Sequence, residues 1–335
     1  MLIAVGIAVG VGVLLAFLWY TIDMLLLVFA GILVAVLLRA PASWVAARSP
    51  LSGGWSVALF ILFLALVLWG GGKLVAAPVI AQLTELSVAL PEKAAQVKQH
   101  LLIQPWGEKV VDQVESINWT SRRINVLGRM TGALSTAFGW VANLVIICFL
   151  GLYLAFQPDP YVNGLVRLFP VPRRHRVRQV LERISHTLRW WLVGTFLSMT
   201  MVGVLTWLGL WLLGMPLALA LALLAAVFAF VPYLGPILSA VPAVLLAFTQ
   251  SPQQALYVVL LYLAVQAVES NLLTPLVQQQ AVEMPAAMML FAQITLGVLV
   301  GGIGVVLATP LAAAAMVAVR MLYVEDVLGD SEGAG

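Results

Sequence analysis

The chain alternates between long apolar runs and short polar segments, a pattern that predicts a helical membrane protein. A helix needs about 20 apolar residues to cross a hydrocarbon core of roughly 30 Å, and runs near that length recur along the sequence. The expected full spans are 2–18, 22–38, 55–71, 131–156, 190–213 and 251–271. The first run has no charged residue before it and a second run follows at once, so we interpret it as a span rather than a removable signal peptide.

Two further pairs of apolar pieces are short for a full crossing. One pair flanks a Pro/Gly turn at 231–236, and the other flanks a glycine turn at 301–304. Broken backbone survives at membrane depth only against protein or a wet cavity, so both pairs are predicted to be re-entrant helical hairpins. We therefore expect an all-α polytopic fold with about eight hydrophobic spans. The candidate turn and gating residues are Pro232, Gly235, Pro236, Gly301, Gly302, Gly304 and Pro310.

The two hairpins share a plan. A Met-Pro pair opens each of them, at 215–216 and at 284–285, and a full span precedes each. If one span goes outward and the other inward, the two units have opposite orientation. Inverted repeats with interrupted helices in matching positions are a sequence pointer to a secondary transporter whose site lies near the membrane midplane.

Polar segments divide the chain into six parts. Between 73 and 130 the composition becomes mixed, with prolines and with apolar residues at helical spacing, which predicts a small extramembrane helical insert. Between 157 and 189 arginines lie opposite an apolar helical face, as in an interfacial amphipathic helix. The predicted parts are 1–72 (spans one to three), 73–130 (insert), 131–156 (span four), 157–189 (Arg-rich segment), 190–324 (transport core with two span-plus-hairpin units) and 325–335 (tail).

Charge distribution sets the predicted orientation. Cytoplasmic loops carry an excess of Lys and Arg, which places the Arg-rich segment inside, together with the loop that carries Arg39 and Arg48. Both termini are then cytoplasmic, provided that an even number of crossings follows. We expect a multi-pass protein of a bacterial inner (cytoplasmic) membrane, with the lipid bilayer as its surroundings.

Composition narrows the classes of function. The 335 residues are 63% hydrophobic and 9% charged, with a mean hydropathy of +1.06, whereas soluble domains carry about 25% charge. A net charge of +3 gives no reason to expect a nucleic-acid partner. The single cysteine and three scattered histidines offer no metal centre, the chain has no HExxH motif and no phosphate-binding loop, and we predict neither an enzyme nor a bound cofactor.

Glu269 is the candidate functional carboxylate. Between Trp190 and Val319 the only charged side chains are Glu269 and Glu283, and a carboxylate inside a bilayer is costly unless it faces a polar cavity. Gln266 lies three residues earlier, on the same helical face. An apolar cavity disfavours the charged form of a carboxylate, which predicts a proton or cation site. The alternative is a structural carboxylate that hydrogen-bonds a broken helix end. Glu283 suits a hairpin start at the water boundary.

The polar surface around Glu269 extends along the chain. We predict substrate or ion contacts at Glu269, Gln266, Asn271, Thr274 and Tyr233. Tyr233 is either a gate of the first hairpin turn or an anchor at the membrane interface.

Three segments carry a family resemblance. They are VPYLGPILSAVPAVLLAF at 231–248, QAVESNLLTPLV at 266–277 and GVLVGGIGVVLATPLAA at 297–313. Together they resemble the autoinducer-2 exporter family of bacterial permeases, in which a PYxGP turn, a Q-x-x-E-x-N-x-x-x-P stretch and a Gly-rich segment ending in A-x-P-L occur in this order. The second motif matches at Gln266, Glu269, Asn271 and Pro275, while the run 278–280 departs from the small or mixed residues usual there.

The resemblance implies export of a small polar solute, such as a quorum-sensing signal, from a homo-oligomer in the cytoplasmic membrane. In other relatives it implies Na⁺(Li⁺)/H⁺ antiport, here with Glu269 as the ion-binding carboxylate. A passive channel is a further alternative, because helical hairpins and oligomers also build pores. Since no nucleotide motor is encoded, an ion gradient is the implied source of energy for the secondary transporter.

Overall fold

The computed structural model describes residues 21–42, 53–102, 126–273 and 284–329, and these residues are helical with no strand assigned among them. Long α-helices suit a chain that must satisfy every backbone polar group within its own segment. After the helix Thr21–Ala42, the described elements are α2 (Gly53–Leu102), α4 (Val126–Phe156), α5 (Pro158–Arg167), the 3₁₀ turn η1 (Val171–Arg173), α6 (Arg174–Leu212), α7 (Ala218–Phe228), α8 (Leu234–Gln250), α9 (Pro252–Val268), the π-helical turn η2 (Glu269–Leu273), α11 (Ala286–Val300), α12 (Gly302–Val319) and the π-helical turn η3 (Arg320–Glu325).

Four described helices are long and apolar enough to cross a membrane, and a fifth crossing arises if a bent pair counts as one. The four are Thr21–Ala42, Gly54–Lys73, Val171–Leu212 and Gly302–Glu325, and the pair is Val141–Phe156 with Pro158–Arg167, bent by 86°. The expected span 2–18 lies outside the described residues. The expected span 251–271 corresponds to α9 and part of η2, which are not in this set.

The two expected hairpins differ in the lengths of their arms. In the first, α7 and α8 are both short apolar helices. In the second, α11 is short, whereas α12 and η3 together are long enough to cross. The described residues therefore establish four or five candidate spans, fewer than the eight hydrophobic spans expected.

Two boundaries expected from composition are not breaks in the helices. The second half of the Arg-rich segment, from Arg174 onwards, and the following span form one continuous helix, α6. Likewise α2 runs from the third span into the expected insert, with Pro78 and Pro91 inside it. Each proline removes one backbone hydrogen bond, yet α-helix continues on both sides of it. Proline positions were therefore poor markers of where this helix ends.

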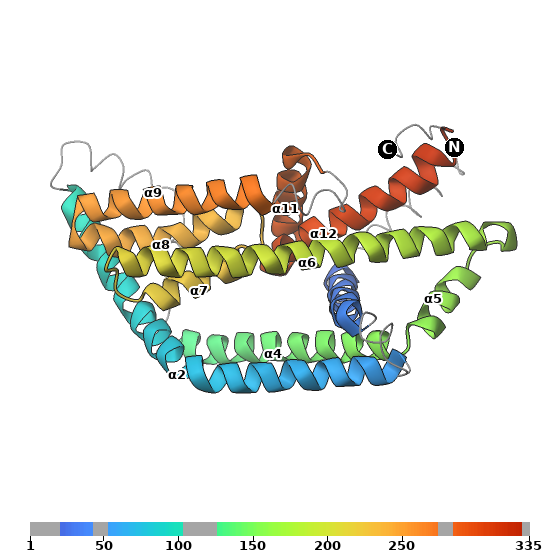
Figure 1. Cartoon of the computed structure of the whole chain (residues 1–335), viewed down its shortest axis with the longest axis horizontal. Helices are drawn as coiled ribbons and strands as arrows, with labels where there is room; N and C mark the ends of the chain where they lie inside the picture. The colour runs from blue at the N-terminus through green and yellow to red at the C-terminus, as the bar shows by residue number, and fades with distance from the viewer. Residues whose placement is uncertain (1–20, 43–52, 103–125, 274–283, 330–335) are drawn as a thin grey trace. The chain divides into compact units, whose positions relative to one another are not determined.

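The chain divides into two compact units, each described here by itself. Unit 1 comprises Met1–Phe63, Gly139–Trp191 and Ala281–Gly335, and unit 2 comprises Leu64–Phe138 and Leu192–Gln280. In unit 2, α8 packs between α7 and α9 (Figure 1). The core of unit 2 is apolar and rich in alanine, which allows close approach of the helices. The buried core residues include Leu210, Met215, Ala220, Leu221, Ala243, Leu246, Ala247, Ala255 and Val258.

Part of the expected extramembrane insert belongs to this core. Leu86 of α2 is buried in it, and Leu83 and Leu90 pack against it at helical spacing. Gln82, one residue earlier, accepts a hydrogen bond at its Oε1 from the backbone N–H of Ala220, at 3.1 Å. Ala220 lies in the first turn of α7, where the backbone N–H groups have no partner within the helix. A side chain from α2 therefore caps α7.

The turn between α7 and α8 depends on close backbone contact. A Cβ added to Gly235 would lie 1.9 Å from the carbonyl oxygen of Phe228, so no larger residue fits there. Tyr233 precedes α8 with a φ of 65°, and Leu217 precedes α7 with a φ of 57°. Left-handed conformations at non-glycine residues cost about 1–3 kcal/mol each. Strained residues therefore stand before both arms of this hairpin.

Unit 1 contains close helix crossings and a polar tether. A Cβ on Gly151 of α4 would lie 2.5 Å from Val34, which shows how tightly α4 meets the helix Thr21–Ala42. On α6, Val177, Val180 and Leu188 are buried, as the amphipathic pattern predicts. Arg176 on the polar side of α6 pairs with Glu325 at 2.7 Å and with Asp326 at 2.9 Å, which ties the end of η3 to α6.

The second hairpin, also in unit 1, turns at one residue. Gly301 has a φ of 78° between α11 and α12, a conformation that favours glycine. A Cβ on Gly304 would lie 2.2 Å from the carbonyl oxygen of Leu296. Both observations agree with the predicted glycine turn, although neither establishes a re-entrant path.

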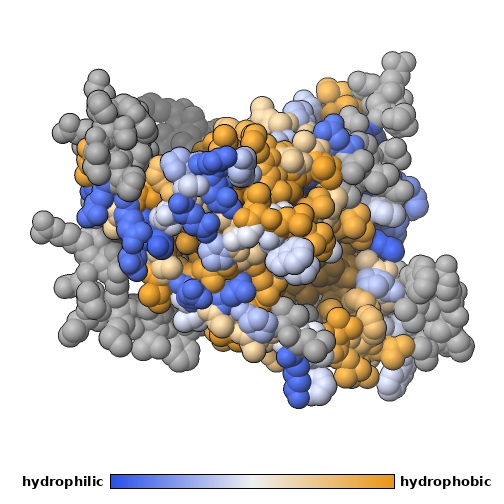
Figure 2. Space-filling view, turned by 60° about the vertical axis from the view of Figure 1, so that its left-hand side comes forward, coloured by the Kyte–Doolittle hydropathy of each residue, from blue (hydrophilic) through white to orange (hydrophobic). Residues whose placement is uncertain are grey.

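Exposed apolar side chains cover much of the surface of these helices. Figure 2 shows broad hydrophobic areas with hydrophilic residues grouped between them. On α2 the exposed apolar side chains include Trp55, Leu62, Phe63 and Leu66, and on α4 they include Leu144 and Phe149. Exposed apolar surface on this scale is expected where lipid, rather than water, surrounds a protein.

We predict that Gly235→Ala destabilises the protein, because its methyl group would overlap the carbonyl oxygen of Phe228. Overpacking of this kind costs roughly 1–3 kcal/mol or more. The thermal unfolding midpoint of the purified protein in detergent should fall. Gly302→Ala is the matched control in the other hairpin turn, where an added Cβ meets no atom within 4 Å. An unchanged midpoint for Gly235→Ala would contradict the described turn.

We predict that Gln82→Ala loosens the start of α7, because the amide of Ala220 loses its partner and lies where water does not reach it. Loss of a helix cap costs roughly 0.5–2 kcal/mol. Hydrogen–deuterium exchange should speed up at 218–221. Gln96→Ala is the control on the same helix, since the hydrogen bonds of the Gln96 side chain to other described residues go to Lys93 and Glu92, within one turn of it. Equal exchange in both variants would rule out the cap.

Candidate functional site

The candidate site lies in unit 2, where α9 gives way to a π-helical turn. Glu269 is the first residue of η2 and follows directly on α9. Such wide turns within helices occur often at functional sites, because they turn side chains and carbonyls out of the regular pattern. The side chains of Ser270 and Asn271 both donate hydrogen bonds to the carbonyl oxygen of Ala267, at 3.2 and 2.7 Å. The polar residues after Glu269 thus satisfy the end of the helix.

Both carboxylate oxygens of Glu269 accept a hydrogen bond. Gln266 Nε2 donates to Oε2 at 3.0 Å, and Ser198 Oγ on α6 donates to Oε1. Ser198 is buried, and Glu269 is half-buried. Hydrogen bonds to a charged acceptor are stronger than those between neutral groups, so two neutral donors stabilise the carboxylate without supplying a counter-charge.

An apolar cluster lies directly beside these three residues. Val202 of α6, Ala225 of α7, the following Ala229, and Val265 of α9 form its buried part. Met199 packs against it, one residue after Ser198, and Val265 is one residue before Gln266. The packing of α6, α7 and α9 therefore fixes where Ser198, Gln266 and Glu269 meet. A carboxylate beside such a cluster has few competing polar partners.

The chemistry available at this site is that of one carboxyl group, the two oxygens of Glu269. A serine hydroxyl can donate or accept and a glutamine amide can do both, so the same partners suit a charged or a protonated Glu269. The described residues include no group of three or more His, Cys, Asp or Glu that would hold a metal ion. Oxygen ligands of this kind suit a proton or a hard cation.

The other predicted contact residues are not all brought to this carboxylate. Asn271 is exposed, and the hydrogen bond described for its side chain goes to Ala267. Tyr233 is 45% exposed at the hairpin turn, and its hydroxyl makes no hydrogen bond to another described residue. Thr274 and Glu283 lie outside the described residues. Gln266 is thus the one predicted neighbour that the described structure joins to Glu269.

The predicted turn residues lie at helix breaks and inside helix arms. Pro232, Gly235 and Pro236 surround the start of α8, and Ser239 donates a hydrogen bond to the carbonyl of Pro236 at 3.1 Å. Gly301, Gly302 and Gly304 stand at the start of α12, and Pro310 is buried within it. These two sets belong to different units and are described separately.

Two polar contacts were missed by reasoning from the sequence. Ser198 lies in an apolar run with no motif around it, so its bond to Glu269 could be found only from the packing of α6 on α9. Gln293 of α11 is fully buried and donates a hydrogen bond to Thr309 of α12 at 3.3 Å. A polar residue in the middle of each arm was the available signal for that pair.

Comparison with known proteins identifies the family. Residues 7–323 match the family model described as AI-2E family transporter. The chain is 28% identical to YueF of Bacillus subtilis (strain 168), a protein named for a transport role, over 75% of this chain and 72% of YueF. It is 24% identical to the AI-2 transport protein TqsA of Escherichia coli (strain K12), over 87% of this chain and 82% of TqsA. Together with its apolar helices, this match makes the chain an integral membrane protein with a role in transport. The chain belongs to the AI-2E transporter family.

Proposed function

We propose that this protein is a secondary transporter of the cytoplasmic membrane that exports a small polar solute, driven by an ion gradient. The observation that carries the proposal is the carboxylate of Glu269, which holds two neutral hydrogen-bond donors and lies beside an apolar cluster. Ionisable groups in spanning segments mark ion pathways and proton relays. Glu269 is assigned the binding of the coupling proton or cation, with Ser198 and Gln266 orienting its oxygens.

The proposed solute follows from the similarity of this chain to TqsA. The name of TqsA refers to AI-2, which makes this polar signal the first solute to test. The hairpin turn at 231–236 is assigned to gating, since Tyr233 has a strained backbone and Gly235 admits no side chain. Leu217, which precedes α7, has a positive φ as well. Gly301 would serve the second hairpin in the same way. We further propose that both hairpins are re-entrant and that both termini are cytoplasmic.

The coupling mechanism follows from competition for one carboxylate. A proton and a monovalent cation cannot both be held by the same oxygen pair at full strength, because each neutralises the negative charge that attracts the other. Binding of the cation therefore favours release of the proton. Ser198 stabilises the charged form by donating to Oε1, and Gln266 does so at Oε2. Exchange of a proton for a cation changes the charge distribution at Glu269. We propose that the hairpins change conformation in response to this change.

We predict that Glu269→Gln abolishes ion-coupled proton movement, because the amide keeps the size and the polar contacts but cannot ionise. Purified protein is reconstituted in liposomes with an internal pH dye, and Na⁺, Li⁺ or K⁺ gradients are imposed. The wild type should show saturable, cation-dependent proton movement that is absent in the variant. Glu182→Gln is the control, since Glu182 is an exposed carboxylate of α6 in the other unit.

The outcomes of that experiment separate the alternatives. Proton flux that is equal in Glu269→Gln and wild type would reduce Glu269 to a structural carboxylate. A wild type silent towards ions but able to export AI-2 would remove the ion coupling and leave solute export standing. Flux that follows the imposed gradient without saturation would indicate a channel rather than a transporter.

We predict that Ser198→Ala raises the half-saturating cation concentration on the order of tenfold, the loss of one hydrogen bond to a charged group. Ser198→Thr keeps the hydroxyl and should restore most of the affinity. Ser270→Ala is the matched control, because among the described residues its hydroxyl bonds the carbonyl of Ala267 and not Glu269. If Ser198→Ala and Ser270→Ala behave alike, the hydroxyl of Ser198 has no part in ion binding.

A further inference from the structure

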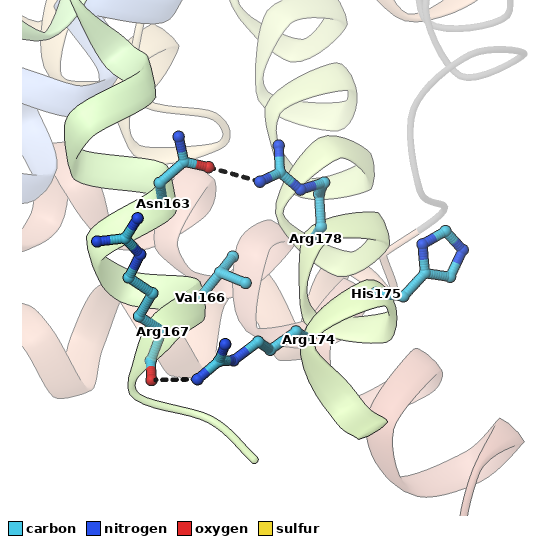
Figure 3. A pocket seen from close by; sticks show the side chains of 6 residues that line it. All are labelled: Asn163, Val166, Arg167, Arg174, His175 and Arg178. Carbon is cyan, nitrogen blue, oxygen red and sulfur yellow. Dashed lines mark hydrogen bonds between the residues drawn. The ribbon is translucent and has the colours of Figure 1, made fainter. Parts of the chain in front are cut away.

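A basic crevice lies in unit 1, between α5 and the first turns of α6. It has a volume of about 380 Å³, within the range of small-molecule sites. Figure 3 shows that α5 supplies one wall and α6 the other, with the buried side chain of Val166 directed into the space between them. The lining residues are Asn163, Val166, Arg167, Arg174, His175 and Arg178.

Hydrogen bonds to neutral groups hold two of these arginines in place. Arg174 donates from Nε to the carbonyl of Phe169 at 3.1 Å and from Nη2 to the carbonyl of Arg167 at 3.4 Å. Arg178 donates from Nη2 to Asn163 Oδ1 at 2.5 Å, across the crevice (Figure 3). Both guanidinium groups are therefore ordered before any ligand arrives, and each keeps further N–H donors.

The positive charge of the crevice is not balanced by carboxylates. Among the described residues, Arg167, Arg174 and Arg178 form no ion pair, whereas Arg176 on the next face of α6 pairs with Glu325 and Asp326. The nearest carboxylates along α5 and α6 are Asp159 and Glu182, and neither lines the crevice. The site therefore presents three full positive charges beside one another.

The backbone adds to this imbalance. The N-terminal end of a helix carries partial positive charge, which acidic residues in the first turn usually offset. The first turn of α6 contains no acidic residue and instead begins Arg174, His175, Arg176. Positive side chains at the positive end of a helix repel it, and an anion bound there would relieve that repulsion.

We propose that the crevice between α5 and α6 binds a phosphate-bearing anion, through Arg174 and Arg178 with Arg167 closing over it. Phosphate is favoured because a planar guanidinium offers two parallel donors that match two phosphate oxygens. Val166 forms an apolar floor, which excludes water from one side of the anion. The phosphate is either the headgroup of an anionic lipid or a free phosphate ion, and both share the chemistry that these side chains recognise.

The lipid source fits the sequence around the crevice. Basic segments near spanning helices attract anionic headgroups. Arg167 lies on α5, which follows directly on α4, and Arg174 is the first residue of α6, which belongs to the candidate span Val171–Leu212. A headgroup bound here would hold the bend between α4 and α5 against α6.

The test measures lipid binding by the purified full-length chain in a non-ionic detergent. Dilute phosphatidylglycerol is compared with phosphatidylcholine of the same acyl chains, and native mass spectra give the fraction of protein that carries each lipid. We expect the wild type to prefer phosphatidylglycerol. Arg178→Gln should weaken that binding on the order of tenfold, the loss of one charge-assisted hydrogen bond, while glutamine can still reach Asn163.

Two further variants keep the test decisive. Arg167→Gln removes a side chain with no hydrogen bond to another described residue, so the fold does not depend on it, and it should also weaken binding. Arg183→Gln removes an exposed arginine of α6, the helix that carries Arg178, but Arg183 does not line the crevice. This variant should leave the affinity for phosphatidylglycerol unchanged. Equal losses in Arg183→Gln and Arg178→Gln would overturn the proposal, since general charge would then explain binding.

Inorganic phosphate separates the two sources. If millimolar phosphate displaces phosphatidylglycerol from the wild type but not from Arg178→Gln, a free phosphate ion is a ligand of the crevice. If phosphate has no effect while the lipid preference and its loss in Arg178→Gln hold, the ligand is the lipid headgroup. The site would be refuted if the wild type showed no preference for phosphatidylglycerol and bound no phosphate.

Discussion

The fold depends on one constraint, which is that a polar group inside a bilayer finds no water and must bond within the protein. Helices meet this constraint for the backbone, and the described residues are accordingly helical. Side chains take over this role at two of the helix ends. At η2 the side chains of Ser270 and Asn271 bond the carbonyl of Ala267, and at the start of α7 a glutamine from α2 bonds the amide of Ala220.

The same constraint explains why Glu269 has the neighbours it has. A carboxylate in apolar surroundings is tolerated when donors occupy its oxygens, and Ser198 and Gln266 do this from two different helices. Neither donor carries charge, so both contact the carboxylate through hydrogen bonds alone.

The sequence predicted the parts of this arrangement that are local in the chain. Apolar runs predicted the helices, Pro and Gly marked the breaks before α8 and α12, and a spacing of three residues placed Gln266 beside Glu269. Contacts between distant segments could not be predicted in this way. Ser198 has no local signature, and Gln82 lies in a segment whose mixed composition indicated an independent insert, although Leu86 packs into the core of unit 2. Pro78 and Pro91 were misleading because a helix of the length of α2 can lose single hydrogen bonds and still continue.

Leu217 and Tyr233 stand before the two arms of the first hairpin, each in a left-handed conformation that glycine would adopt without strain. A protein selected only for stability would replace both. For protein engineering, glycine at these two positions offers a route to higher thermal stability that leaves Glu269 and its two hydrogen-bond donors unchanged. If α7 left its present conformation, the strain released at these two residues would offset part of the cost of exposing its buried alanines.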